Sequence, residues 1–437
     1  MKKTLALILA AVMALSLVAC AKTPANGGTE AKGSVYYLNF KPEADQAWQD
    51  LAKTYTEQTG VEVKVVTAAS GQYDTMLTSE LDKSAPPTMF QVGNQGAVNS
   101  YGDFCYPLDN TDVMKEMTTQ DFNLKNANGE TVSIGYCYEA YGIIVNKALL
   151  KQAGYELSDI TNFETLKKVA DDIHSRAAEL GFDAFSSAGL EGSSSWRFSG
   201  HLANMPLFYE FRDDKVTAQP AAIKGTYLDA FKNVWDLYTT DSATTGAALT
   251  TATGDASEAE FGQGKAVFFQ NGSWEYANLV TSDDKGFKMN PEDLAMIPIY
   301  CGVEGEEKAG LCCGTENCWA VNAKASAEDI QATLDFMYWL VTDAEVSRML
   351  VDEFAVMPYK QAAESTCGFL ADANAYAAEG NYVMPWVTNF QPNVDAYREA
   401  IVAAMNQYDN DPTDANWEQV KTAFVDGWAV QYAAANG

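Results

Sequence analysis

Strand-like and helix-like sequence patterns alternate without a break between residues 34 and 92. The run 34–40 is rich in Tyr and Val and predicts a strand, and 61–67 and 88–92 predict two more. Between these runs lie two segments whose apolar residues recur at helical spacing. They are Ala44, Trp48, Leu51, Ala52 and Tyr55, and then Tyr73, Met76, Leu77 and Leu81. This order predicts a mainly parallel sheet with helices on its faces.

The chain is long enough for more than one hydrophobic core. It has 437 residues, of which 47% are hydrophobic, and a single core rarely grows beyond about 300 residues. Further helices are predicted near 163–180, 327–341, 395–408 and 414–433. We therefore expect two α/β domains, with no membrane-spanning segment after the N-terminus.

The N-terminus has the features of an export signal. Lys2 and Lys3 precede thirteen uncharged residues, 5–17, and a membrane span needs about 20 apolar residues. The run Leu17-Val18-Ala19-Cys20 resembles the lipobox of bacterial lipoproteins, which implies cleavage after residue 19 and a lipid on Cys20. An ordinary signal peptide is the alternative. Residues 20–33 lack the apolar residues of a core and predict a flexible tether.

Charge and metal-binding residues exclude several functions. The formal net charge is −30, so nucleic acid and anionic lipid surfaces are poor partners. With only two histidines, His174 and His201, a catalytic zinc centre has no support. The acidic run 409–414 lacks the glycine and glutamate of a calcium loop. We expect no metal and no cofactor.

Eight cysteines are present, and seven remain if Cys20 carries a lipid. An odd number cannot pair completely, and a chain this large needs no disulfides to fold. We expect mostly reduced, buried thiols. A disulfide from Cys137 to Cys312 or Cys313 is a further hypothesis.

Three segments together resemble the family 1 extracellular solute-binding proteins of ABC importers, in their carbohydrate-binding branch. Residues 141–154 (YGIIVNKALLKQAG) are similar to the family's strand that enters the second domain. Residues 261–274 (FGQGKAVFFQNGSW) are similar to its buried strand with a Gly-x-Trp at the cleft. Residues 313–324 (CGTENCWAVNAK) are similar to the strand that returns to the first domain.

The resemblance implies a periplasmic-binding-protein-like fold of two α/β domains. The first domain would comprise 34–138 and 315–362, and the second 144–310 and 366–437. A hinge of three segments, 137–141, 311–315 and 360–365, would join them. Ligand would bind between the domains, and closure around it would signal to an importer.

A sugar site needs aromatic planes for the C–H faces of the ring, and amides, carboxylates or Arg for its hydroxyls. We expect the contacts in loops that the fold aims at the cleft. The candidate ligand-binding residues are Phe40, Gln91, Asn94, Gln95, Glu139, Trp196, Arg197, Asn271, Trp274, Glu316, Asn317 and Trp386.

The sequence therefore predicts a monomeric, lipid-anchored, non-enzymatic binding protein that delivers a mono- or small oligosaccharide to ABC permease subunits. Three alternatives remain. One is a secreted carbohydrate-active enzyme with paired carboxylates, although no catalytic motif accompanies any pair. A binding protein for a non-sugar polar solute is the second. The third is a surface adhesin, which the absence of repeats disfavours.

Overall fold

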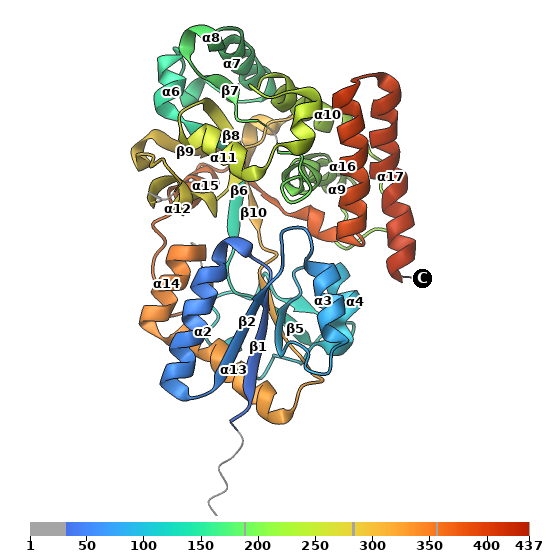
Figure 1. Cartoon of the computed structure of the whole chain (residues 1–437). Coiled ribbons are helices and arrows are strands. Elements are labelled where there is room, and N and C mark those ends of the chain that lie inside the picture. Colours follow the sequence, from blue (N-terminus) through green and yellow to red (C-terminus); the bar gives the residue numbers. More distant parts are fainter. Residues whose placement is uncertain (1–31, 188, 282–284, 355–356, 437) are drawn as a thin grey trace, which may run out of the picture. The chain divides into compact units, whose positions relative to one another are not determined.

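The computed structural model describes residues 32–187, 189–281, 285–354 and 357–436. The predicted signal peptide, Cys20 and most of the predicted tether lie outside these residues. The part from Gly33 onward forms one compact unit, and it contains two β-sheets, each with its own helices (Figure 1). We call the elements around the first sheet the first lobe, and those around the second sheet the second lobe.

The first sheet has six strands in the order β2-β1-β3-β11-β5-β4. The strands β1, β2 and β3 are parallel, as predicted, whereas β11 runs antiparallel to β3 and β5. Their bounds are β1 (Ser34–Asn39), β2 (Glu62–Thr67), β3 (Met89–Gln91), β4 (Leu124–Lys125), β5 (Thr131–Gly135) and β11 (Cys318–Val321).

The second sheet has the order β12-β10-β6-β8-β7, and β9 also pairs with β6. It is less parallel than predicted, because the long strand β6 is antiparallel to β8, β9 and β10. β6 leads the chain into the second lobe and β10 leads it back to the first, so these two strands run in opposite directions. Their bounds are β6 (Glu139–Asn146), β7 (Asp183–Phe185), β8 (Ala266–Gly272), β9 (Leu294–Ile297), β10 (Ala309–Gly314) and β12 (Tyr382–Pro385).

Helices cover both faces of both sheets (Figure 1). The first lobe has α2 (Asp45–Thr59), α3 (Tyr73–Leu81), α4 (Gln95–Tyr101), α5 (Asp112–Lys115), α13 (Ala327–Thr342) and α14 (Ala344–Phe354). The second lobe has α6 (Lys147–Gln152), α7 (Phe163–Ser175), α8 (Ala177–Leu180), α9 (Ala203–Asp214), α10 (Leu228–Thr240), α11 (Gly254–Gly262), α12 (Glu275–Thr281), α15 (Gly368–Ala378), α16 (Val394–Asn410) and α17 (Asp414–Asn436).

Alternation along the strands divides each lobe into two cores. In β1, Tyr37 packs against α2 and α13, whereas the next residue, Leu38, packs against α3 and α4. Phe268 and Phe269 of β8 divide between the two faces of the second sheet in the same way. Successive side chains of a strand point to opposite faces, so a strand covered on both sides is apolar throughout.

Three segments pass from one sheet to the other. Residues 136–138 join β5 to β6, residues 315–317 join β10 to β11, and the chain crosses again between α14 and α15. All seven cysteines from Cys105 to Cys367 are free thiols. Burial raises the pKa of Cys137 well above its usual range, which suppresses its reactive thiolate. Within the described ranges, no helix is both long and apolar enough for a membrane span.

Candidate ligand-binding site

Five aromatic rings gather in the second lobe beside the crossing segments. They are Tyr141, Trp196, His201, Trp274 and Trp386, and we call them the aromatic cluster. The His201 ring stacks on Tyr141, with centroids 3.9 Å apart and planes 10° apart. It also lies 4.9 Å from Trp196 and 5.3 Å from Trp274. The three tryptophans are partly exposed, so the cluster offers apolar surface to a ligand.

Two glycines allow two of the tryptophans to lie flat on the sheet. A Cβ at Gly272, at the end of β8, would lie 2.2 Å from the Trp274 ring, and a Cβ at Gly314, at the end of β10, would lie 2.7 Å from the Trp386 ring. Strands β8 and β10 flank β6, which carries Tyr141. The predicted Gly-x-Trp pattern thus has a steric reason, because only glycine leaves room for the ring.

Trp196 and Arg197 open a π-helical turn, Arg197–Leu202, that also carries His201. The Arg197 guanidinium lies 4.6 Å from the Trp196 ring. Although Arg197 is only 8% exposed, its guanidinium donates a single hydrogen bond within the described residues, to the carbonyl of Ser194 at 3.2 Å. No Asp or Glu carboxylate among the described residues forms an ion pair with the Arg197 guanidinium. A buried guanidinium has five N–H donors, so this one retains capacity for a ligand.

Several fully buried polar atoms around the aromatic cluster have no partner within the described residues. They are Nε of Arg197, Oε1 of Gln270 and Nε1 of Trp386. Leaving such a group without a hydrogen bond costs about 1–3 kcal/mol. Their gathering in one place is typical of a site whose remaining hydrogen bonds come from a ligand or from water.

A buried carboxylate lies next to the cluster. Asn271, which is fully buried, donates to Oε1 of Glu275 at 2.9 Å. Burial, followed by the nearby Glu258 carboxylate, raises the pKa of Glu275 to about 7, whereas Arg197 acts in the opposite direction. Glu258 is itself paired with Lys285 at 2.6 Å. The side chain of Asn271 therefore holds the Glu275 carboxyl group in place.

The residues of the crossing segments form a second group, which we call the hinge network. Nζ of Lys41 lies 2.6 Å from Oε1 of Glu139, and the amide of Asn317 donates to Oε2 of Glu139 at 2.8 Å. The side chains of Lys41 and Glu139 are 6% and 4% exposed. Burial opposes the charge of Lys41, but Glu139 and Glu43 outweigh it and raise its pKa. This buried ion pair joins the first lobe to β6.

Gln91 extends the hinge network into the first sheet. Its Nε2 donates to the Tyr136 hydroxyl at 3.2 Å, and its Oε1 accepts from the backbone N–H of Phe40 at 2.6 Å. Nζ of Lys41 also lies 5.7 Å from the centroid of the Trp274 ring. The hinge network and the aromatic cluster are therefore adjacent.

A cavity of about 410 Å³ lies between the lobes, on the side of α3, α4 and α16. Asp74 of α3 lines it from the first lobe, and Asp395 of α16 lines it from the second. Near it, Arg398 pairs with Glu316 at 3.6 Å. Burial, then Asp395 and Glu316, raise the pKa of Asp74 to about 7 despite Arg398. The carboxylates thus oppose each other across the junction.

Nine of the twelve predicted site residues fall into two groups, and the other three lie elsewhere. Trp196, Arg197, Asn271, Trp274 and Trp386 come together in or beside the aromatic cluster, and Phe40, Gln91, Glu139 and Asn317 surround the hinge network. Glu316 lies at the Arg398 ion pair. Asn94 caps α4 by accepting from the N–H of Ala97 at 2.8 Å and lines the cavity of 410 Å³. Gln95 is bonded to the Lys125 carbonyl and Asn99.

Six residues of this region are not among the predicted contacts, namely Lys41, Tyr141, His201, Gln270, Glu275 and Arg398. Three of them had a local signal, because Lys41, Gln270 and Glu275 directly adjoin the predicted Phe40, Asn271 and Trp274. His201 and Tyr141 meet only through the fold. Their sequence separation of 60 residues left no pattern to detect.

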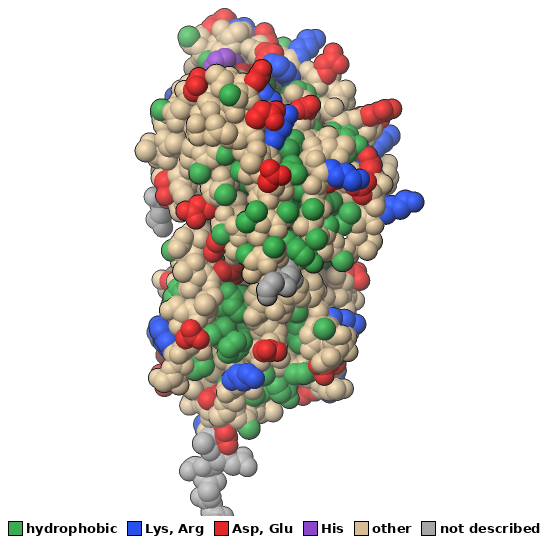
Figure 2. Space-filling model, turned by 90° about the vertical axis from the view of Figure 1, so that its right-hand side faces the viewer, with side chains coloured by type: hydrophobic (Ala, Val, Ile, Leu, Met, Phe, Trp, Pro, Cys, Tyr) green, Lys and Arg blue, Asp and Glu red, His purple; other side chains and the backbone are tan. Residues whose placement is uncertain are grey.

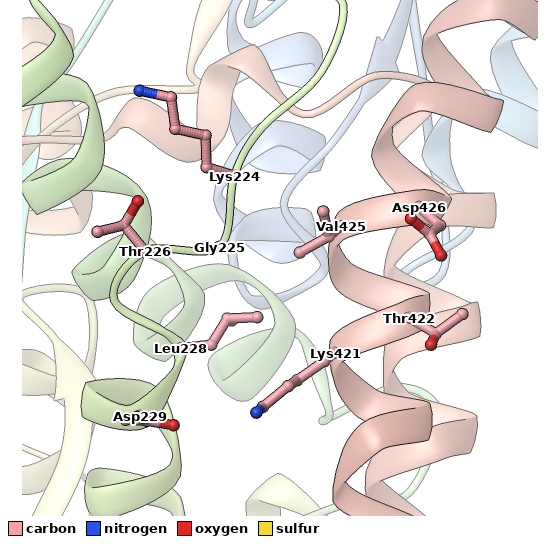
Figure 3. A pocket seen from close by; sticks show the side chains of 9 residues that line it. All are labelled: Lys224, Gly225, Thr226, Leu228, Asp229, Lys421, Thr422, Val425 and Asp426. Atoms are coloured by element: carbon pink, nitrogen blue, oxygen red, sulfur yellow. The ribbon is translucent and has the colours of Figure 1, made fainter.

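Two other features of the second lobe are separate from this site. A cavity of about 340 Å³ lies between α17 and the start of α10 (Figure 3). Leu228 and Val425 face each other across it, while Lys224 points outward and pairs with Asp214. The face formed by α16 and α17 gathers hydrophobic side chains (Figure 2), including Val430, which is 62% exposed. No metal-binding group of three or more ligands occurs among the residues that the structure describes.

Sequence comparison decides the family. The sequence model described as bacterial extracellular solute-binding protein matches residues 50–365, which is well over half of the chain. This protein is a bacterial extracellular solute-binding protein. The family membership expected from the three sequence segments is confirmed, and the protein is exported. None of the curated proteins that were compared matches the chain significantly.

Solved structures of this solute-binding protein's fold are numerous but distant in sequence. The binding protein RafE in complex with raffinose is 15% identical, with a TM-score of 0.69 over 92% of this chain and 100% of that chain. A sugar transporter from Bacillus licheniformis in complex with stachyose is 15% identical, with a TM-score of 0.67 over 91% and 100%. A chitin oligosaccharide binding protein is 14% identical, with a TM-score of 0.68 over 92% and 99%. The predicted two-domain α/β fold is confirmed.

Proposed function

We propose that this solute-binding protein captures a mono- or small oligosaccharide between its lobes and delivers it to the permease of an ABC importer. The observation that carries the proposal is the aromatic cluster beside buried, unpartnered polar atoms. Sugars present C–H faces and many hydroxyls, so they need both features at once. The ligands in the names of the structural neighbours, raffinose, stachyose and chitin oligosaccharide, agree with this class.

The geometry supports binding more than catalysis. Glu139 and Glu275 each accept hydrogen bonds from asparagine side chains, and Glu139 is also held by Lys41. A hydrolase needs two carboxyl groups on opposite sides of a scissile bond, one to act as acid and one as base or nucleophile. Glu139 is instead held by Lys41 and Asn317, and Glu275 by Asn271 and Asn278, so both carboxyl groups are fixed by the chain itself. We therefore propose a binding protein without enzymatic activity.

Isothermal titration calorimetry against a panel of neutral mono-, di- and trisaccharides tests this function. We expect one class of sugar to bind at one site per chain. Amino acids, polyamines and divalent metals form the second panel. Tight binding of one of these with no sugar bound would overturn the ligand class, and release of product from a labelled oligosaccharide would overturn the assignment as a binding protein.

We further propose that a lipid on Cys20 anchors the exported protein to the outer face of the cell membrane. The support is the sequence Leu17-Val18-Ala19-Cys20 behind an uncharged core too short to span a bilayer. An anchor would raise the local concentration of the protein at its permease. Replacing Cys20 with Ser should move the protein from the membrane fraction to the medium without changing its affinity for sugar. A Cys105→Ser variant is the control, and membrane retention of Cys20→Ser would contradict the anchor.

A further inference from the structure

His201 occupies the centre of the aromatic cluster and is the one member that can donate and accept hydrogen bonds through its ring. One face stacks on Tyr141, and its other neighbours are the partly exposed rings of Trp196 and Trp274. Its residue exposure is only 9%. An imidazole in this position is held at a fixed place and angle beside the surface that a ligand would cover.

The neighbouring strand β8 gives one ring nitrogen of His201 a hydrogen-bond partner. Nε2 of Gln270 lies 3.0 Å from Nδ1 of His201. In this orientation of the amide its nitrogen faces the ring and can only donate, so Nδ1 is the acceptor. Burial, followed by the charges of Arg197 and Arg398, lowers the pKa of His201 well below its usual range. A neutral imidazole has one proton, which must then lie on Nε2.

The Nε2–H group is left available for a ligand. Within the described residues, the only hydrogen bond of the His201 ring is the one at Nδ1. Trp196 and Trp274 offer π-faces and edges but no strong acceptor near the ring. A donor so placed, next to apolar planes, fits a sugar hydroxyl oxygen at the rim of a stacked ring.

We propose that the Nε2–H of His201 donates a hydrogen bond to a hydroxyl oxygen of the bound sugar, and that Gln270 is the positioning residue that fixes this polarity. The proposal rests on the proposed sugar-binding function and adds a specificity-determining residue to it. A ligand that presents only a donor at this point, such as an ammonium group in place of the hydroxyl, is disfavoured.

Three variants test the role through sugar affinity, with thermal unfolding as the control for folding. His201→Phe keeps a ring on Tyr141 but removes the donor, and should weaken binding about tenfold. His201→Gln places an amide N–H near the position of Nε2 and should recover most of this loss. At a pH above the imidazole pKa, which the new carboxylate raises, Gln270→Glu should draw the proton to Nδ1, convert Nε2 into an acceptor and weaken binding about as much as His201→Phe.

Nitrogen NMR of labelled histidine gives a second readout that does not depend on knowing the sugar. Only His174 and His201 occur in the chain, so a His174→Gln background leaves one imidazole to observe. We expect the Nε2–H tautomer with no titration from pH 8 to pH 5.5, and the Nδ1–H tautomer in Gln270→Glu. Addition of the sugar should shift the Nε2 resonance more than that of Nδ1.

These experiments distinguish failure of the role of His201 from failure of the proposed sugar-binding function. If the wild type binds sugar while His201→Phe binds within twofold of it, or if the free protein shows the Nδ1–H tautomer, the role of His201 is overturned and the sugar-binding function stands. If the wild type binds no sugar, the proposed function fails, and with it this role, whatever the tautomer.

Discussion

The aromatic cluster and the hinge network are adjacent, but they differ in whether their buried polar groups have hydrogen-bond partners within the protein. In the hinge network, Lys41, Glu139 and Asn317 are buried and bonded to one another. In and beside the aromatic cluster, Trp386 and Arg197 carry buried N–H groups without a partner in the described residues. The polar groups of the hinge network are satisfied within the protein, whereas those at the aromatic cluster need a ligand or water to complete their hydrogen bonds.

This difference separates residues that hold the lobes from residues that meet the ligand. Removing one member of a satisfied buried network leaves another unpaired, and the protein loses stability. Removing a member of an unsatisfied cluster should lower the stability of the free protein little, but it should weaken ligand binding strongly. Stability and affinity should therefore respond to different substitutions in two regions that are only 5.7 Å apart at Lys41 and Trp274.

The largest effect is expected for Lys41→Met, which leaves the Glu139 carboxylate buried without its cation. We expect the free energy of unfolding to fall by about 3 kcal/mol, because breaking a buried ion pair strands a charge. Urea denaturation measures this change. Lys53→Met is the matched control, since the pair Lys53–Glu57 is exposed and 4.0 Å long, and it should cost less than about 0.5 kcal/mol. An equal loss of unfolding free energy in the two variants would show that the buried Lys41–Glu139 pair does not stabilise the protein more than an exposed pair does.

Trp274→Ala should lower sugar affinity more than it lowers stability, in contrast to Lys41→Met. We expect sugar affinity to fall roughly thirtyfold, because a central aromatic anchor contributes about 2 kcal/mol to binding. Stability should change less, since the ring is partly exposed. Calorimetry and thermal unfolding measure the two quantities. Trp48→Phe, at a fully buried ring in the first lobe, is the control that should lower stability and leave affinity unchanged.

Gly272→Ala tests the same ring indirectly. The added Cβ would lie 2.2 Å from the Trp274 ring and force it off the sheet, so affinity should fall about tenfold through displacement of the stacking plane. Gly102→Ala is the control, because its Cβ would meet only Val98 at 3.9 Å. Unchanged affinity in Gly272→Ala would show that Trp274 need not lie on the sheet to bind.

The smallest effect concerns pH and the carboxylates that face each other across the cavity of 410 Å³. The pKa of Asp74 is about 7 in this lobe arrangement and returns to its ordinary, lower value if the lobes separate. This arrangement therefore binds a proton that a more separated one releases. Raising the pH from the ordinary pKa of an aspartate to about 7 progressively disfavours this arrangement, and the effect levels off above pH 7. Affinity should fall a few-fold from pH 6 to pH 8.

Asp395→Asn isolates this contribution, because it removes the carboxylate that opposes Asp74. The variant should show a shallower pH dependence in calorimetry. A residual slope is expected from Glu275, whose pKa is also about 7, and Glu275→Gln should remove that part. A wild-type affinity that rises from pH 6 to pH 8 would contradict the assignment to Asp74.

Much of the fold could be predicted because its signals are local. The alternation from residue 34 to 92 predicted β1, α2, β2, α3 and β3, and all five are present. Burial periodicity depends only on spacing along the chain, and a continuous apolar strand requires cover on both faces. The direction of β6 against β8 and β10 could not be predicted in this way, since strand pairing across more than 100 residues leaves no periodic trace.

The site likewise has one part that local sequence predicts and another that depends on the fold. By itself, the sequence determined the class of residue to look for, and Gly272 and Trp274 could be found because a ring next to a glycine is a local pattern. Only the tertiary structure decided that Trp196, Trp274 and Trp386 share one cluster, that Lys41 pairs with Glu139, and that the Gln270 amide lies against Nδ1 of His201. Hydrogen bonds and ring stacking depend on distances of a few ångströms between distant parts of the chain, and those distances exist only once both sheets have formed.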